Sequence, residues 1–253
     1  MVQLEALLEY CNRYLRVDEF RDYCPNGLQV EGKAEIKTII TGVTASQRLL
    51  DLAVELQADA ILVHHGYFWK NEDARIIGIK RNRLATLLKH NISLLAYHLP
   101  LDAHAEVGNN VELARRLSIQ NISCEQQGAL KGLLWQGELI SPCTADEFSR
   151  QIAVALNRKP LHLAAPARPV IQKLAWCTGG AQGYLEQAAA LGVDAYISGE
   201  VSEQTFHLAD ELNVHYFAAG HHATESYGVQ ALGTHLAGRF ELAVQHIDVF
   251  NPV

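Results

Sequence analysis

Short apolar segments alternate with amphipathic stretches along most of this chain. Within the stretches, apolar residues recur every three to four positions, as Leu49, Leu52 and Leu56 do, which is typical of a helix with one buried face. Short apolar runs separated by such helical stretches indicate βαβ units with a parallel sheet. The pattern predicts strands at 36–43, 60–63, 92–97, 171–177, 195–198, 214–218 and 241–247, and helices at 1–15, 79–90, 202–212 and 223–238. The segments 44–58 and 178–192 each combine a turn of small residues with an amphipathic helix. A further helix is expected to open at Asn109, and Thr144 with Glu147 forms a capping box.

The chain is also similar to itself. Residues 36–60 align without a gap with residues 171–195, at an offset of 135 positions. We interpret this as an internal repeat, although two ordinary βαβ units could resemble each other by coincidence. The predicted fold class is α/β, with two related three-layer lobes that arise from the repeat and contain mixed, mostly parallel sheets. The lobes are placed at 1–127 and 128–253, with the alternative that the C-terminal helix and strand pack back on the first lobe.

Composition narrows the class of protein further. The 21 basic and 28 acidic residues give a net charge of −7, so a broad nucleic-acid-binding face is not indicated. The first 15 residues form an amphipathic pattern with two glutamates and not a signal peptide, and no stretch approaches the roughly 20 apolar residues of a membrane span. Five scattered cysteines without a Cys-x-x-Cys pair are expected to be reduced thiols. We therefore expect a soluble, cytoplasmic protein with no membrane partner.

Histidines and carboxylates follow three of the predicted strands. His64 and His65 follow the strand at 60–63, the segment from His98 to His104 follows the strand at 92–97, and the segment from His221 to Glu225 follows the strand at 214–218. Ligands of open parallel sheets gather at the carboxyl ends of the strands. The three segments are therefore expected to meet at one edge.

The residue types in these segments suit a metal centre. His221 and Glu225 lie one helical turn apart and can share an ion, and His64 with His65 and Asp102 adds two imidazoles and a carboxylate. Five ligands are too many for one tetrahedral zinc and suit two ions, with zinc, iron, manganese, cobalt and nickel left open. Taken singly, the histidine pair could be a packing feature, His221 with Glu225 a surface ion pair, and Asp102 a turn residue.

Other polar residues have two interpretations each. His98, His104 and His222 are expected either to orient the ligands and transfer protons or to be solvated loop histidines. The turn from Thr178 to Gly183 could cradle a phosphate, but a tight-turn role for its glycines is favoured. The other histidines are interpreted as structural, and the three tryptophans as core or interface residues: His90, His162, His207, His215, His235, His246, Trp69, Trp135 and Trp176.

Seven segments resemble one known family: YCPNGLQVEG (23–32), TGVTAS (41–46), DAILVHHGYFW (59–69), HLPLDAH (98–104), GNN (108–110), SGEVSEQ (198–204) and AAGHHATE (218–225). They are similar to the GTP cyclohydrolase 1 type 2 homologues, also described as NGG-interacting-factor-like dinuclear metal-centre proteins, and in particular to the short bacterial type without an inserted domain. The resemblance implies two divalent metal ions per subunit, with Glu225 as the bridge, and a toroidal homohexamer. The ligands that it implies are His64, His65, Asp102, His221 and Glu225.

The leading hypothesis is a metal-dependent hydrolase that acts on a nucleotide or a related small molecule, as a cyclohydrolase or a phosphoesterase. His98 and His222 are the candidate catalytic residues, as general acid or base. The alternative is a non-catalytic metal-binding scaffold or interaction protein. A dinucleotide-dependent enzyme is disfavoured because the glycine fingerprint is absent, and covalent catalysis is not supported because no Gly-x-Ser-x-Gly sequence occurs.

Overall fold

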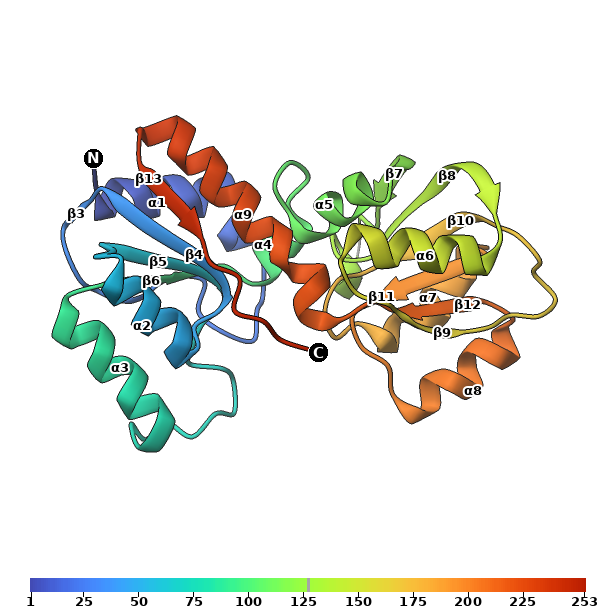
Figure 1. Cartoon of the computed structure of the whole chain (residues 1–253), viewed down its shortest axis with the longest axis horizontal. Helices are drawn as coiled ribbons and strands as arrows, with labels where there is room; N and C mark the ends of the chain where they lie inside the picture. The colour runs from blue at the N-terminus through green and yellow to red at the C-terminus, as the bar shows by residue number, and fades with distance from the viewer. Residues whose placement is uncertain (127) are drawn as a thin grey trace. The chain divides into compact units, whose positions relative to one another are not determined.

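In the computed structural model, residues 1–126 and 128–253 are described, and they form two compact units (Figure 1). The first unit contains Met1–Leu101 and Gly228–Phe250, and the second contains Asp102–Tyr227 and Asn251–Val253. The lobe boundary expected at residue 127 lies outside the described residues. The division into 1–127 and 128–253 therefore stays a prediction.

The first unit is built on a five-stranded sheet with the order β13-β4-β5-β6-β2 (Figure 1). β13, β4, β5 and β6 run parallel to their neighbours, and β2 pairs antiparallel with β6 at the edge. β5 and β6 consist almost entirely of buried residues, as expected for parallel strands with helices on both faces. The bounds are β2 Gly27–Val30, β4 Thr38–Thr44, β5 Ala60–His65, β6 Ser93–Ala96 and β13 Ala243–His246.

Helices connect the parallel strands of this sheet. α2 (Gln47–Glu55) and α3 (Gly78–His90) place Leu49 and Leu87 in a core cluster with apolar residues of β4, β5 and β6. α2 begins after Ser46, whose hydroxyl accepts a hydrogen bond from the backbone of Leu49 at 3.3 Å. The remaining elements of this unit are α1 (Leu4–Tyr14), the short strands β1 (Val2–Gln3) and β3 (Glu35–Ile36), which pair with each other, the 3-10 helix at Val17–Glu19 and the C-terminal part of α9 (His221–Phe240).

The second unit contains a six-stranded sheet with the order β7-β8-β10-β11-β12-β9 (Figure 1). Its three central strands β10, β11 and β12 are parallel, and the outer strands pair antiparallel with their neighbours. The bounds are β7 Ile119–Cys124, β8 Trp135–Cys143, β9 Leu161–Leu163, β10 Ile171–Trp176, β11 Ala195–Ser198 and β12 His215–Ala218.

The core of the second unit lies between this sheet and two of its helices. α5 (Asn109–Arg116) and α6 (Ala145–Ala155) contribute apolar residues to a cluster that includes Trp176 and Phe217. The expected capping box is confirmed, because the Thr144 hydroxyl accepts from the Glu147 backbone while the Glu147 carboxylate accepts from the Thr144 backbone. The other elements are α7 (Leu185–Ala190), α8 (Glu203–Leu212), the first turns of α9 and 3-10 helices at Gly128–Leu130 and Gln182–Tyr184. The short helix α4 (Leu99–Ala103) is divided between the two units, and its last two residues belong to the second.

One hydrogen-bond network recurs in both units at the offset of the sequence repeat. In the first unit, Asp59 accepts hydrogen bonds from the backbone of residues 37 and 38 and from the Lys33 side chain, at 2.6–3.0 Å. In the second, Asp194 accepts from the backbone of residues 172 and 173 and from the Arg168 side chain, at 2.8–3.0 Å. All four positions are related by 135 residues. This recurrence is what a duplicated unit would produce, and the repeat itself stays an interpretation.

The predicted α/β class with mixed sheets is confirmed. Parallel pairs predominate in the sheet of the first unit, whereas the sheet of the second unit has two parallel and three antiparallel pairs. Two local predictions are wrong. The strand expected at 60–63 continues through His64 and His65, and Asp102 lies in the short helix α4 and not in a loop. In the segment 178–192, a turn and a short 3-10 helix precede α7, and side-chain groups accept hydrogen bonds from the backbone of Thr178 and Gly179 in this turn. Among the described residues, no helix combines the length and apolar character that a membrane crossing requires.

Candidate metal centre

Three histidines of the first unit form a cluster. His64 and His65 are the last two residues of β5, and His98 follows the neighbouring parallel strand β6. The ring centroid of His64 lies 4.6 Å from that of His65 and 5.1 Å from that of His98. One nitrogen of each ring lies within 4.8 Å of the other two. The histidine cluster thus offers three imidazole nitrogens in one small volume.

Oxygen atoms orient all three rings of the histidine cluster. Nδ1 of His64 lies 2.9 Å from the carbonyl oxygen of Tyr97, which can only accept, so Nδ1 carries the hydrogen and Nε2 is the nitrogen that can bind a metal. Nδ1 of His65 lies 3.3 Å from the hydroxyl of Thr44. Nδ1 of His98 lies 2.7 Å from Oδ1 of Asp22. Hydrogen bonds of this kind fix the orientation of metal-binding histidines in proteins.

Asp22 is itself held by several donors. Its carboxylate accepts hydrogen bonds from the backbone of Tyr23 at 2.6 Å and Leu99 at 2.9 Å and from the Asn26 side chain at 2.8 Å, in addition to the bond from His98. Burial raises the pKa of this carboxyl, but the hydrogen bonds and the charge of His98 outweigh burial and lower the pKa below its usual value. Asp22 is therefore ionised and keeps the proton of His98 on Nδ1.

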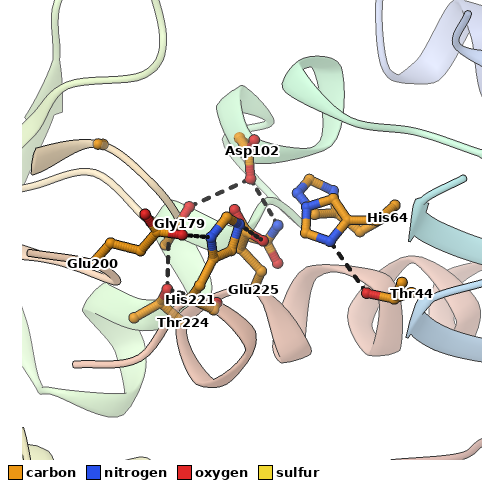
Figure 2. A network of polar contacts seen from close by, with 12 residues as sticks. Thr44, His64, Asp102, Gly179, Glu200, His221, Thr224 and Glu225 are labelled. Atoms are coloured by element: carbon orange, nitrogen blue, oxygen red, sulfur yellow. Dashed lines mark hydrogen bonds and ion pairs between the residues drawn. The ribbon is translucent and has the colours of Figure 1, made fainter. Parts of the chain in front are cut away.

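His221 of the second unit lies between two carboxylates (Figure 2). Its Nδ1 lies 2.7 Å from Oε1 of Glu200, and its Nε2 lies 3.0 Å from Oε2 of Glu225, one turn further along α9. Burial lowers the pKa of His221, but the hydrogen bonds and charges of Glu225 and then Glu200 outweigh it and raise the pKa to about 9. A cation bound in place of this proton would have the same two carboxylates beside it.

Asp102 completes the acidic part of the second unit. Its Oδ1 accepts a hydrogen bond from the Asn109 side chain at 2.7 Å, and the Thr178 hydroxyl lies 3.4 Å away. One of its carboxylate oxygens lies within 4.8 Å of one of Glu225. Burial and then the charges of Asp102 and Glu225 raise the pKa of the nearby Cys177 thiol well above its usual value. The thiol of Cys177 is therefore protonated in the absence of a metal ion.

The glycine turn after β10 supports the acidic cluster, and several of its backbone amides already bond to side chains. The backbone N–H groups of Thr178 and Ala181 donate to side chains of Asn110 and Ser198 at 3.1 Å. That of Gly179 donates to the Thr224 hydroxyl at 3.0 Å (Figure 2). Gly179 has φ +69°, and a Cβ at this position would lie 2.0 Å from Oε1 of Glu225. The tight-turn interpretation of these glycines is the one that the structure supports.

The sequence-predicted site residues therefore occur in two groups. The first unit brings His64 and His65 together with the candidate His98, and the second brings Asp102, His221 and Glu225 together. Their role as metal ligands stays a prediction. Of the remaining candidates, His104 accepts hydrogen bonds from the backbone of residues 106 and 107, and His222 donates its backbone N–H to Val253.

Three neighbours of the site were missed by sequence reasoning. Glu200 lies two residues after the end of β11, so the strand-end argument applied to the other strands would have found it. Asp22 and Thr44 carry no comparable signal, because Asp22 lies in an irregular segment and Thr44 ends a strand as an ordinary β-branched residue. Trp135 and Trp176 are buried, as expected, but the Trp69 ring lies against His65 and His98 and is only partly buried.

Comparison with known proteins agrees with this arrangement of fold and side chains. Residues 2–252 match the description of one family, DUF34/NIF3 (NGG1p interacting factor 3). The match covers nearly the whole chain, so the chain belongs to the DUF34/NIF3 family.

Individual relatives are similar over their full length. Proteins named GTP cyclohydrolase 1 type 2 homolog from Yersinia pestis and Pseudomonas aeruginosa are each 54% identical to this chain over 251 residues, with 99% of this chain and at least 98% of the relative covered. A solved structure of the protein ybgI, described as of unknown function, is 50% identical, with full coverage of both chains and a TM-score of 0.95. The protein TTHA1606 from Thermus thermophilus is 31% identical, also with full coverage, at a TM-score of 0.89.

Proposed function

We propose that this protein binds two divalent cations per subunit through His64, His65, Asp102, His221 and Glu225, with Glu225 as the bridging ligand. The observation that carries the proposal is the state of His221, whose two nitrogens face Glu200 and Glu225 at 2.7 and 3.0 Å. A carboxylate that accepts from Nδ1 is the usual partner of a metal-binding imidazole, and Glu225 beside Nε2 would be a second ligand of the same ion.

The donor set fits such ions. Imidazole nitrogens and carboxylate oxygens suit zinc, iron, manganese, cobalt and nickel, and the residues do not choose among these metals. Chain connectivity also favours a shared centre, because only three residues separate His98 of the histidine cluster from the ligand Asp102.

We further propose that the protein is a hydrolase of a nucleotide or a related small molecule, as the name of its relatives suggests. When bound, divalent metals supply Lewis-acid activation of water and of the electrophile. Within the chain, His98 is the candidate proton-transfer residue, because ionised Asp22 keeps the Nδ1 hydrogen in place and directs Nε2 to accept a proton. His222 is the second candidate, since it neighbours the ligand His221.

The test combines metal analysis with two product assays. Protein purified without added metal is analysed by inductively coupled plasma mass spectrometry, and chelated and reloaded samples are incubated with GTP. Formate release identifies a cyclohydrolase, and phosphate release identifies a phosphoesterase. We expect metal to be bound and to be lost in His221→Ala, and one product to form only in reloaded protein. Absence of both products above the buffer rate would reject the hydrolase, and absence of metal would reject the centre.

The family name refers to an interacting factor, which favours one alternative. In that alternative the chain is a non-catalytic metal-binding scaffold. His64→Ala is expected to bind less metal. If this variant still captures a protein partner as efficiently as the unchanged chain does, the scaffold function is supported.

We also propose that six copies assemble into a toroid in the cytoplasm. Ile76, Ile77 and Ile79 expose 57%, 56% and 69% of their surface, which is the kind of apolar patch that an interface between copies buries. Native mass spectrometry is expected to give six times the 28.0 kDa mass of one chain, and Ile79→Lys is expected to yield smaller species.

A further inference from the structure

Two aromatic side chains lie beside the histidine cluster of the first unit. The Trp69 ring meets the His98 ring at a centroid distance of 5.0 Å and an interplanar angle of 86°, and it lies 5.9 Å from the His65 ring. The Tyr23 ring meets His98 at 6.4 Å and 65°. Both rings therefore contact the same imidazole from different loops.

Trp69 is held in a defined orientation. Its indole N–H donates to the carbonyl of Gly66 at 3.2 Å, and its backbone N–H donates to the Glu72 carboxylate at 3.1 Å. The preceding residue Phe68 has φ +63°, a conformation that is costly for an aromatic residue, while its ring packs against the core of the first unit. This strained turn directs Phe68 inward and places Trp69 against the histidines, and such strain is concentrated at functional sites.

Tyr23 combines a fixed backbone with an exposed ring. Its N–H donates to Asp22 at 2.6 Å, and its carbonyl accepts from the backbone of Lys70 at 2.6 Å, which joins the two aromatic loops. Nevertheless, 59% of Tyr23 is exposed. An exposed aromatic ring on a fixed backbone next to a polar cluster is typical of a binding surface and not of a core.

We propose that Tyr23 and Trp69 form a stacking subsite for a flat heteroaromatic ring, such as a nucleobase, beside the histidine cluster. Aromatic faces bind such rings by stacking, and the neighbouring imidazoles can form hydrogen bonds to the nitrogens and oxygens at the edge of the ring. The subsite would select substrates that contain a flat heteroaromatic ring. Binding of such a ring does not depend on the proposed function, whereas any reaction that follows binding does.

Tryptophan fluorescence and calorimetry test the subsite. Trp135 and Trp176 are 4% and 0% exposed, so Trp69 is the tryptophan that a stacked base can quench. The probes are guanosine monophosphate and ribose 5-phosphate, which lacks the base, added to metal-loaded protein. We expect quenching by the nucleotide alone and an affinity for it at least about tenfold higher than for the sugar phosphate.

Variants separate stacking from other roles. Tyr23→Ala and Trp69→Leu are expected to weaken nucleotide binding by about 5- to 100-fold and to leave sugar-phosphate binding unchanged, while Trp69→Phe keeps most of the affinity. Phe206→Leu, which changes an exposed aromatic residue of α8, is the matched control and is expected to have no effect.

Three results would overturn the subsite: equal binding of the two probes, no response to any of the variants at Tyr23 and Trp69, or a change in subunit assembly in Tyr23→Ala without a change in nucleotide affinity. Metal content is measured on every sample. If only the metal proposal is wrong, the protein still prefers guanosine monophosphate over ribose 5-phosphate but contains no metal. If only the subsite is wrong, the protein contains metal but does not prefer the nucleotide.

Discussion

Glu200 accepts a hydrogen bond from Nδ1 of His221 at 2.7 Å, while Nε2 of the same ring faces Glu225 at 3.0 Å. Glu200 thereby determines which nitrogen of His221 is directed toward the acidic cluster. Because its own carboxylate acts through the ring, Glu200 is a positioning residue for the proposed metal centre.

Glu200→Gln is expected to lower metal affinity by about 10- to 100-fold, because the amide oxygen can still accept from Nδ1 but carries no negative charge to increase the basicity of the imidazole. Competition with a chromophoric chelator measures the change. Glu203→Gln, three positions later at the start of α8, is the control and is expected to bind metal normally. Equal affinities of the two variants would exclude the positioning role.

Asp22→Asn is expected to leave metal content unchanged and to reduce the proposed hydrolysis by at least about tenfold, because the amide no longer keeps the His98 proton on Nδ1. Each oxygen of this carboxylate faces two donors, so the NH2 group of the amide leaves two of them without this acceptor, at a cost of about 1–3 kcal/mol each. Thermal unfolding and product assays measure both effects, and exposed Asp18→Asn is the control.

The lowered pKa of Asp22 also predicts an acid dependence. A carboxyl with a lowered folded-state pKa stabilises the fold at pH values above its unfolded-state pKa of about 4, and this contribution is lost as the pH falls through the folded-state value. The stability advantage of the unchanged chain over Asp22→Asn should therefore be largest near neutral pH and shrink in acid. A constant difference across urea titrations between about pH 7 and pH 3 would contradict this.

Gly179→Ala is expected to destabilise the second unit and to lower metal content. The methyl group would meet Oε1 of Glu225 at 2.0 Å, and φ +69° costs an alanine about 1–2 kcal/mol even without the clash. Thermal unfolding and metal analysis are the measurements. Gly183→Ala, where a Cβ meets nothing within 4 Å, should behave like the unchanged chain, and similar behaviour of the two variants would refute the argument.

Metal binding is expected to strengthen as the pH rises from about 7 to 9. With a pKa of about 9, His221 is protonated at neutral pH in the absence of metal, and the cation must displace this proton. Affinity should increase by up to about tenfold per pH unit and level off above about pH 9. Calorimetry in buffers of different ionisation enthalpy should detect about one proton released from His221 per site near neutral pH, and this release should fall toward zero above about pH 9.

Local sequence patterns were sufficient for much of the fold. The parallel strands and their helices follow from apolar periodicity, and the capping box follows from the side chains of Thr144 and Glu147 alone. The predicted ends of strands and helices were less accurate where tertiary contacts determine where the element ends. β5 continues through His64 and His65 because Thr44 of the parallel neighbour β4 pairs with His65.

The ligand candidates could also be found from sequence, since imidazoles and carboxylates at strand ends are visible as residue types. Asp22 could not be found in this way. Its contact with His98 joins residues 76 positions apart, and nothing in the segment around Asp22 distinguishes it from an ordinary loop carboxylate. The same holds for Trp69, which has the pattern of a core residue but lies against two histidines.

The order of residues alone therefore determined the α/β class, the 135-residue correspondence and the histidines and acids available for chemistry, because periodicity and residue type are local properties. Tertiary structure alone decided that β13 joins β4, that Asp22 orients His98 and that Glu200 orients His221. These relationships depend on the three-dimensional positions of segments that are far apart in the sequence, and such positions are set by packing of the whole unit.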